Sequence, residues 1–121
     1  MCINKVYQMK MKIKIEDLLR INKGFGGNII RTSSLEYAMD KLKENKIGLY
    51  TKLAYLFRSI LVDHPFSDGN KRTAMFFAFF FADEKGKSID GDILAHQILS
   101  IAKNNIADIR KIKRRLMTAI K

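Results

Sequence analysis

A run of nine consecutive residues, His64 to Arg72, holds side chains that could carry out chemistry on a phosphate. Histidine is the side chain that titrates nearest neutral pH, so His64 could take a proton from a hydroxyl nucleophile. Asp68 is a lone carboxylate four residues later. A single carboxylate suits Mg²⁺, because this ion keeps several waters and shares other ligands with substrate phosphates. The two residues therefore predict a base and a metal ligand on one loop.

The second half of this run predicts an anion site. Gly69 and Asn70 open a helix, where free backbone N–H groups and the positive end of the helix dipole attract anions. Glycine lets a ligand approach the backbone closely. Lys71 and Arg72 add two cations, and the arginine could grip a phosphate with two parallel hydrogen bonds. Each feature alone is common in ordinary turns, but together they favour phosphate transfer, which depends mainly on positioning and charge stabilisation.

Two strong helical patterns flank this run and must position it. The first is an amphipathic helix over 49–62, which ends before Pro65 because proline cannot continue a helix. The second begins at Gly69–Asn70 and extends to about Glu84. It is apolar nearly all round, so we expect it to be the central helix. Phe66 is apolar between polar neighbours, and we expect it to anchor the loop to the core.

The rest of the chain is also helical in pattern, with Ser33 or Ser34 and Asp90 as predicted N-caps. The polar stretch 43–48 fits either a turn or a small β-hairpin. No repeat or linker is visible, so the 121 residues are predicted to form one all-α domain with a central loop and helix. The further predicted helices cover about 15–21, 33–42, 93–102 and 104–120.

Charge and composition narrow the class of protein. Hydrophobic residues make up 47% of the chain, which is enough for a core, and the formal net charge is +11. This balance suits an acidic partner such as nucleic acid or a nucleotide, and equally a solvated basic helix face. Much of the charge lies in the N-terminal lysines and in the segment 103–121, which holds Arg110, Lys111, Lys113, Arg114 and Arg115.

Cysteine usage and hydropathy predict a cytoplasmic protein with no membrane segment. Cys2 is the only cysteine, so no intramolecular disulfide can form, which fits a reducing compartment. The longest apolar run, 74–82, is too short to span a bilayer. No apolar stretch follows the N-terminal lysines as a secretory signal would require.

The run His64–Arg72 resembles the signature of the Fic/Doc superfamily, usually written H-x-F-x-[D/E]-[G/A]-N-x-R, and every defined position matches. The wider layout is also similar: an N-terminal helix, a Gly-Gly loop, and a helix on either side of the motif. The short length and Lys71 look like the Doc (death-on-curing) branch, the toxin half of a toxin–antitoxin pair. The resemblance therefore implies a Fic/Doc-like helical bundle.

The resemblance also implies a role for each matching residue. His64 would be the general base that activates a Ser, Thr or Tyr hydroxyl of a target protein. Asp68 would hold Mg²⁺ on the phosphates of ATP, and Phe66 would belong to the core. The stretch 43–48 would be a flap that aligns the target by strand addition. The residues that bind the nucleotide phosphates would be Gly69, Asn70, Lys71 and Arg72.

Two positions bear on the reaction itself. Fic adenylyltransferases usually carry Gly at position 71 and a second arginine at position 75, where this chain has Lys71 and Met75. Doc-type enzymes share the lysine and transfer the terminal phosphate rather than AMP. The resemblance thus implies a protein kinase first, with a translation GTPase as a target and a separate antitoxin as a partner, and a protein adenylyltransferase second. A third reading is a basic nucleic-acid-binding or regulatory module with a relic motif, motivated by the segment 103–121.

Overall fold

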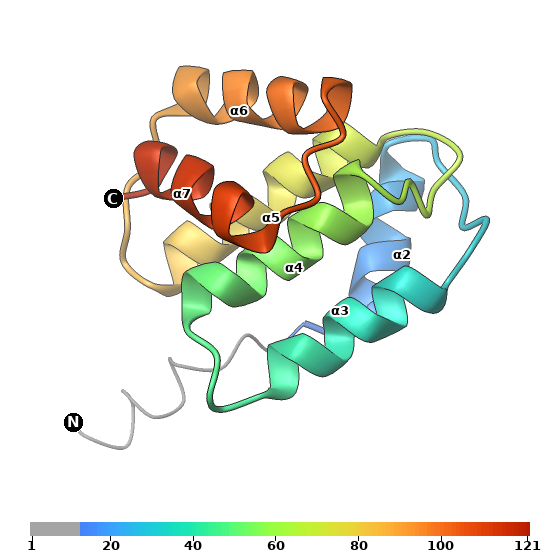
Figure 1. The fold of residues 1–121 in the computed structure, drawn as a ribbon. Helices are drawn as coiled ribbons and strands as arrows, with labels where there is room; N and C mark the ends of the chain where they lie inside the picture. Colours follow the sequence, from blue (N-terminus) through green and yellow to red (C-terminus); the bar gives the residue numbers. More distant parts are fainter. Residues whose placement is uncertain (1–12) are drawn as a thin grey trace.

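Helices form most of the part of the chain that the computed structural model describes, residues 13–121 (Figure 1). The predicted all-α fold is confirmed, since strand-like pairing is limited there to two isolated bridges. None of these helices is both long and apolar enough to cross a membrane. Cys2, Lys5, Lys10 and Lys12 lie outside the described residues. The helices are α2 (Ile15–Gly24), α3 (Ser33–Lys43), α4 (Leu49–Leu61), α5 (Asn70–Glu84), α6 (Gly91–Lys103) and α7 (Ile109–Ala119).

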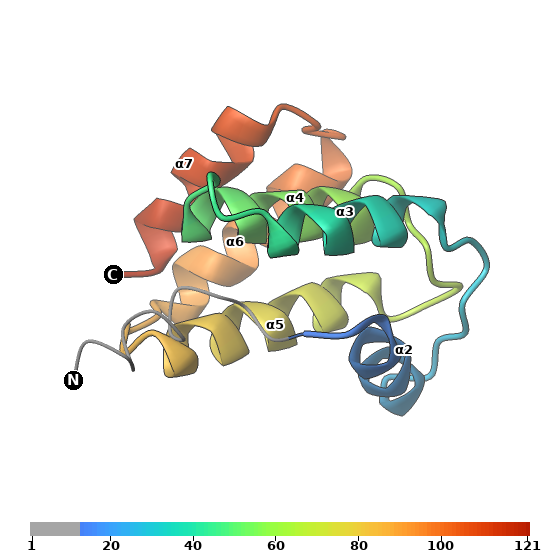
Figure 2. The ribbon, with the colours of Figure 1, turned by 90° about the horizontal axis from the view of Figure 1, so that it is seen from below.

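The central helix is α4, not α5. In Figure 2, α3 and α4 lie in one layer with α5 beneath them, and α4 also packs against α7. Its apolar side chains, such as Leu53 and Phe57, are completely buried. The apolar pattern of α5 predicts a central helix, but its Phe76 and Phe79 are 39% and 47% exposed. The reason is that α2, α4 and α6 cover α5 and leave one of its faces open.

Helix ends follow the predicted chemistry in part. Asp90 caps α6 by accepting the Ile93 N–H at 3.1 Å, as predicted. The last helix begins at Ile109, not at 104 or 105. Its cap is Asp108, whose carboxylate accepts the N–H groups of Lys111 and Arg110; these bonds hold the pKa of Asp108 below its usual value.

The predicted serine caps of α3 are wrong. Thr32 occupies the N-cap position and makes no side-chain capping bond. Ser34 instead shares a hydrogen bond of 2.9 Å with Ser59 of α4. The Ser34 hydroxyl, which the local pattern assigned to a helix cap, is therefore used in packing between α3 and α4.

The polar stretch 43–48 forms a turn rather than a hairpin. Lys43 ends α3, and the next five residues lead to α4 without any strand. This turn precedes α4, whereas His64 follows the other end of the same helix, about 20 Å away at 1.5 Å per residue (Figure 1). The flap position implied by the resemblance is thus wrong for this chain. A different segment, 28–31, lies beside the loop that carries His64.

Candidate functional site

The motif loop, residues 62–69, joins α4 to α5 and is held by an antiparallel contact with 28–30. The Ile30 N–H donates to the Pro65 carbonyl at 2.8 Å, and the Ser67 N–H donates to the Asn28 carbonyl at 2.8 Å. Between these two bonds, Phe66 points into the core and is 2% exposed. The loop therefore has one buried anchor and one neighbouring segment that fixes its course.

The Asn70 side chain bonds the backbone of the motif loop. Its Nδ2 donates to the Phe66 carbonyl at 3.0 Å, and its Oδ1 accepts the Phe66 N–H at 3.4 Å. The side-chain amide thus bonds both the N–H and the C=O of Phe66, as the backbone of a neighbouring strand would. The resemblance assigns Asn70 to an anion hole. Phe66 takes one of the two Nδ2 hydrogens, so the backbone N–H of Asn70 and its second Nδ2 hydrogen are left for an anion.

The start of α5 presents a cradle of N–H groups. Gly69 takes a left-handed conformation with φ of 73°, and the first helical bond runs from the Thr73 N–H to the Gly69 carbonyl at 2.9 Å. The Gly69 N–H donates to the Asp68 carboxylate at 2.7 Å, so an anionic oxygen already lies where a phosphate oxygen could bind. At the start of α5, the N–H groups of Asn70, Lys71 and Arg72 donate to no backbone carbonyl within 13–121.

His64 is exposed at the entry to the motif loop and has a positive φ of 49°. The Arg31 guanidinium donates to the carbonyls of Asp63 at 3.2 Å and His64 at 3.4 Å. These bonds hold the backbone on which the imidazole is mounted. Sequence reasoning missed Arg31, because no local spacing links it to a residue more than thirty positions away.

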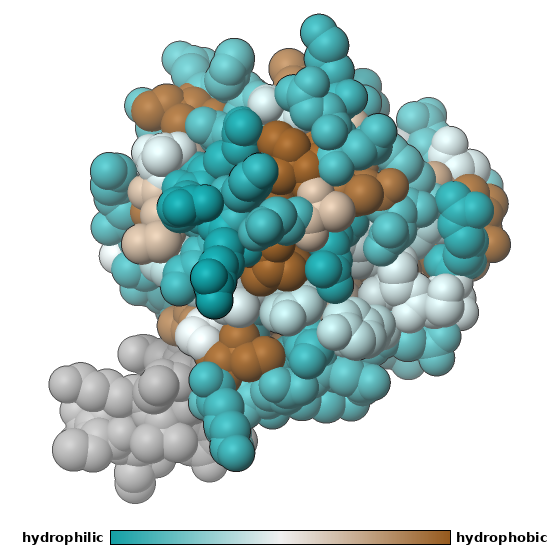
Figure 3. All heavy atoms as spheres, in the orientation of Figure 1, coloured by the Kyte–Doolittle hydropathy of each residue, from teal (hydrophilic) through white to brown (hydrophobic). Residues whose placement is uncertain are grey.

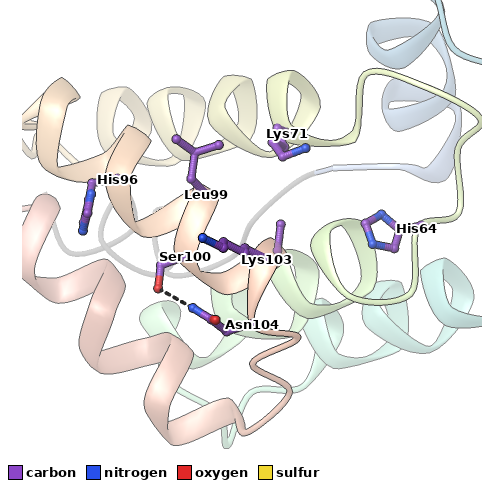
Figure 4. Close-up of a pocket in the computed structure, with 8 residues that line it drawn as sticks. His64, Lys71, His96, Leu99, Ser100, Lys103 and Asn104 are labelled. Carbon is purple, nitrogen blue, oxygen red and sulfur yellow. Dashed lines mark hydrogen bonds between the residues drawn. The ribbon is translucent and has the colours of Figure 1, made fainter.

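His64 and Lys71 stand between two hollows. The first, here called the motif hollow, has a volume of about 290 Å³ and is lined only by His64 and residues 67–72. The second, here called the α6 cleft, is larger, at about 590 Å³. In Figure 4, His64 and Lys71 lie at one end of this cleft and His96 lies at the other. The α6 cleft is lined in addition by Leu99, Ser100, Ala102, Lys103 and Asn104, and none of its lining residues is acidic.

The donor set fits a metal ion that is shared with a ligand. No group of three His, Cys, Asp or Glu side chains comes together anywhere in 13–121. Asp68 is an exposed carboxylate beside the N–H cradle. One carboxylate combined with phosphate oxygens and waters is the coordination typical of Mg²⁺. The residues therefore fit Mg²⁺ that is held jointly with a nucleotide and do not form a cage of protein ligands alone.

Residues 12–82 match the model of the Fic/DOC family. The matched range includes the whole motif loop, all of α4 and all but the last two residues of α5. The chain belongs to the Fic/Doc family. Fic/Doc proteins generally transfer groups to protein hydroxyls and typically use ATP and Mg²⁺. Searches of curated proteins and of solved structures found no match to this chain.

The Fic/Doc match covers the motif hollow but not the α6 side of the cleft. It contains all of the motif hollow, but α6 and α7 lie beyond residue 82. Most of the α6 cleft is consequently built from a helix that the family match does not reach. The family assignment therefore rests on residues 12–82 and does not extend to the α6 side of the cleft.

Proposed function

We propose that this Fic/Doc protein is a Doc-type protein kinase that transfers the terminal phosphate of ATP to a Ser, Thr or Tyr hydroxyl of a target protein. One observation carries the proposal: the exposed His64 opens onto the same hollow as the N–H cradle of α5 and the side chains of Lys71 and Arg72. A base and an anion site sharing one hollow is the arrangement that phosphate transfer to a hydroxyl requires.

Each residue of the motif hollow would have its own role in the reaction. His64 would take the proton of the target hydroxyl as its oxygen attacks the γ-phosphorus, and the bond from that phosphorus to the bridging oxygen breaks to release ADP. The N–H cradle and Arg72 would stabilise negative charge on the phosphate oxygens. Asp68 would hold Mg²⁺ together with those oxygens. The metal, when bound, would supply further charge neutralisation.

Lys71 and Met75 favour phosphate transfer over AMP transfer. Lys71 lines both hollows, so its cation lies at the boundary that a nucleotide would cross. Met75 packs against the core and offers no second clamp for distant phosphates. The α6 cleft has the volume of a small-molecule site and would accept the nucleoside, with Leu99 and Ala102 as its apolar wall.

The segment 28–31 would align the target. Ile29 pairs with Phe66 in an antiparallel bridge of the type in which neither residue bonds the other. The N–H and C=O of Ile29 find no hydrogen-bond partner within 13–121 and point away from the motif loop. Ile29 and Ile30 are also 37% and 57% exposed. This free strand edge supports target binding by strand addition, in place of the stretch 43–48.

Labelled ATP tests the proposal. The protein would be incubated with a translation GTPase, as the first candidate target, and with ATP labelled on either the γ- or the α-phosphate. Label from the γ-phosphate should reach the target, and His64→Ala should abolish the transfer. Label from the α-phosphate would instead establish AMP transfer. If the protein is a toxin of this type, a separate antitoxin that covers the motif hollow should suppress the same signal.

A second candidate function, nucleic-acid binding, is favoured by α7. Arg110, Lys111, Lys113 and Arg114 form no ion pair with any carboxylate in the described part of the chain. Hydrophilic side chains cover much of the α7 face seen in Figure 3. This candidate predicts binding to nucleic acid that weakens steeply with salt and survives His64→Ala. No binding at low salt would eliminate it.

A further inference from the structure

Asn22 reaches the motif from a distant part of the sequence. It lies in the last turn of α2 and is 1% exposed. Its Nδ2 donates to the Asp68 carbonyl at 2.8 Å and to the Thr73 hydroxyl at 3.1 Å. That hydroxyl donates in turn to the Gly69 carbonyl at 2.8 Å. One amide from α2 is thus linked, directly and through Thr73, to two successive carbonyls of the motif.

The bond to Asp68 sets the direction of the Gly69 N–H. In a planar trans peptide the C=O and the N–H point in opposite directions. Because the Asp68 carbonyl points inward to Asn22, the Gly69 N–H points outward, where it now meets the Asp68 carboxylate. Glycine also tolerates the opposite φ, so this peptide could flip if nothing restrained it.

Close packing holds the Asn22 side chain in place. A Cβ built on Gly27 would collide with the Asn22 amide and with the Asp68 carbonyl. The amide is therefore wedged between the backbone of Gly27 and the motif. Its Oδ1 is buried without a hydrogen-bond partner among the described residues. An apolar side chain of the same size would avoid that cost, so packing alone does not explain an asparagine here.

We propose that Asn22 is a positioning residue. It keeps the Asp68–Gly69 peptide turned so that the Gly69 N–H faces the motif hollow and donates to an oxygen of the transferring phosphate. The identity of that anion rests on the proposed function, whereas the orientation of the peptide does not. Asn22 itself touches no reacting atom and acts only through this peptide.

The test compares Asn22→Leu with Tyr50→Phe. Both changes remove a side-chain hydrogen bond to a backbone carbonyl, but Tyr50 bonds Ile120, away from the motif. Crystal structures of the unliganded proteins would show the orientation of the Asp68–Gly69 peptide. The NMR resonance of the Gly69 amide would be followed during titration with ADP and Mg²⁺. We expect Asn22→Leu to fold, to show the flipped peptide and to lose the Gly69 response. Its kcat should fall about 100-fold with little change in KM for ATP, as for loss of one oxyanion donor. Tyr50→Phe should match the wild type in all of these measurements.

Each other outcome is decisive. An unflipped peptide together with a normal Gly69 response in Asn22→Leu would overturn the proposal. If the wild type neither binds ADP nor transfers phosphate, the proposed function fails, while the crystal structures still decide whether Asn22 orients the peptide. If Asn22→Leu does not fold, Asn22→Ala would be measured in the same way. Failure of both variants to fold would show that the residue is structural and would overturn the positioning role.

Discussion

The motif hollow and the α6 cleft share His64 and Lys71 but are built in opposite ways. The motif hollow is lined by residues within nine positions of one another, and its ligand-facing groups include backbone N–H groups and two cations. The α6 cleft is closed by side chains from a helix that begins nearly thirty residues after His64, and its wall is partly apolar. One hollow suits phosphates, and the other suits a larger and less charged group.

This difference indicates how the phosphates and the nucleoside of one nucleotide could be recognised separately. Phosphate recognition depends on backbone geometry, which a short local run can produce. Recognition of a nucleoside depends on shape and apolar contact, which needs a separate wall. The residues at the boundary, above all Lys71, would then control which phosphorus lies nearest His64. The predictions below test this division.

Replacing the base should have the largest effect. His64→Ala should lower the rate of group transfer by about 10²–10⁴-fold, the usual contribution of a general base. The reason is that no other imidazole lies at the boundary of both hollows in the described chain. ADP binding should persist, since the N–H cradle is intact. The measurement is label transfer to target, with His96→Ala at the far end of the α6 cleft as control. Equal loss in both variants would contradict the assignment of His64.

Lys71→Gly should change which group is transferred. Removing the cation that both hollows share should lower γ-phosphate transfer roughly 10–100-fold and raise the proportion of AMP transfer, by loss of one charged phosphate contact. The ratio of γ- to α-label on the target measures this. Lys71→Met keeps most of the side chain but not its charge, so it separates the effect of losing the charge from the effect of losing the side chain's bulk. An unchanged ratio in Lys71→Gly would show that position 71 does not determine the reaction.

A change in the α6 cleft should have a smaller effect, on binding alone. Leu99 is 55% exposed in the cleft, so Leu99→Ser should raise KM for ATP by several-fold, which corresponds to about 1 kcal/mol of lost apolar contact, and should leave kcat unchanged. Ile93→Ser, on the same helix but outside the lining of the cleft, is the matched control. A fall in kcat without a rise in KM would place the nucleoside elsewhere.

Neutralising α7 should leave transfer unchanged. Arg110 and Arg114 line neither hollow, so Arg110→Gln with Arg114→Gln should alter the transfer rate by less than about two-fold, as expected for exposed charges away from a site. If nucleic acid binds α7, the same double change should weaken that binding and reduce its salt slope by about two. Fluorescence anisotropy at several salt concentrations measures both quantities. A large loss of transfer would mean that α7 contributes to the site.

Local sequence was sufficient for the run around His64. Pro65 excludes further helix, Gly69 permits the left-handed turn, and the apolar repeats on both sides predict α4 and α5. These features act over a few residues, so spacing alone identifies them. The same local reasoning misplaced the caps of α3 and α7 and expected α5 at the centre, because burial depends on which helices happen to cover a face.

Only the tertiary structure decided what surrounds that run. Asn22 and Arg31 meet the motif backbone from over thirty residues away, and α6 supplies a wall from the other direction. The same packing turns the Asn70 amide toward Phe66 and brings 28–31, rather than 43–48, to the motif loop. A sequence determines its motif chemistry through short-range backbone preferences. The neighbours of that chemistry depend on how whole helices pack, and no local spacing encodes such contacts.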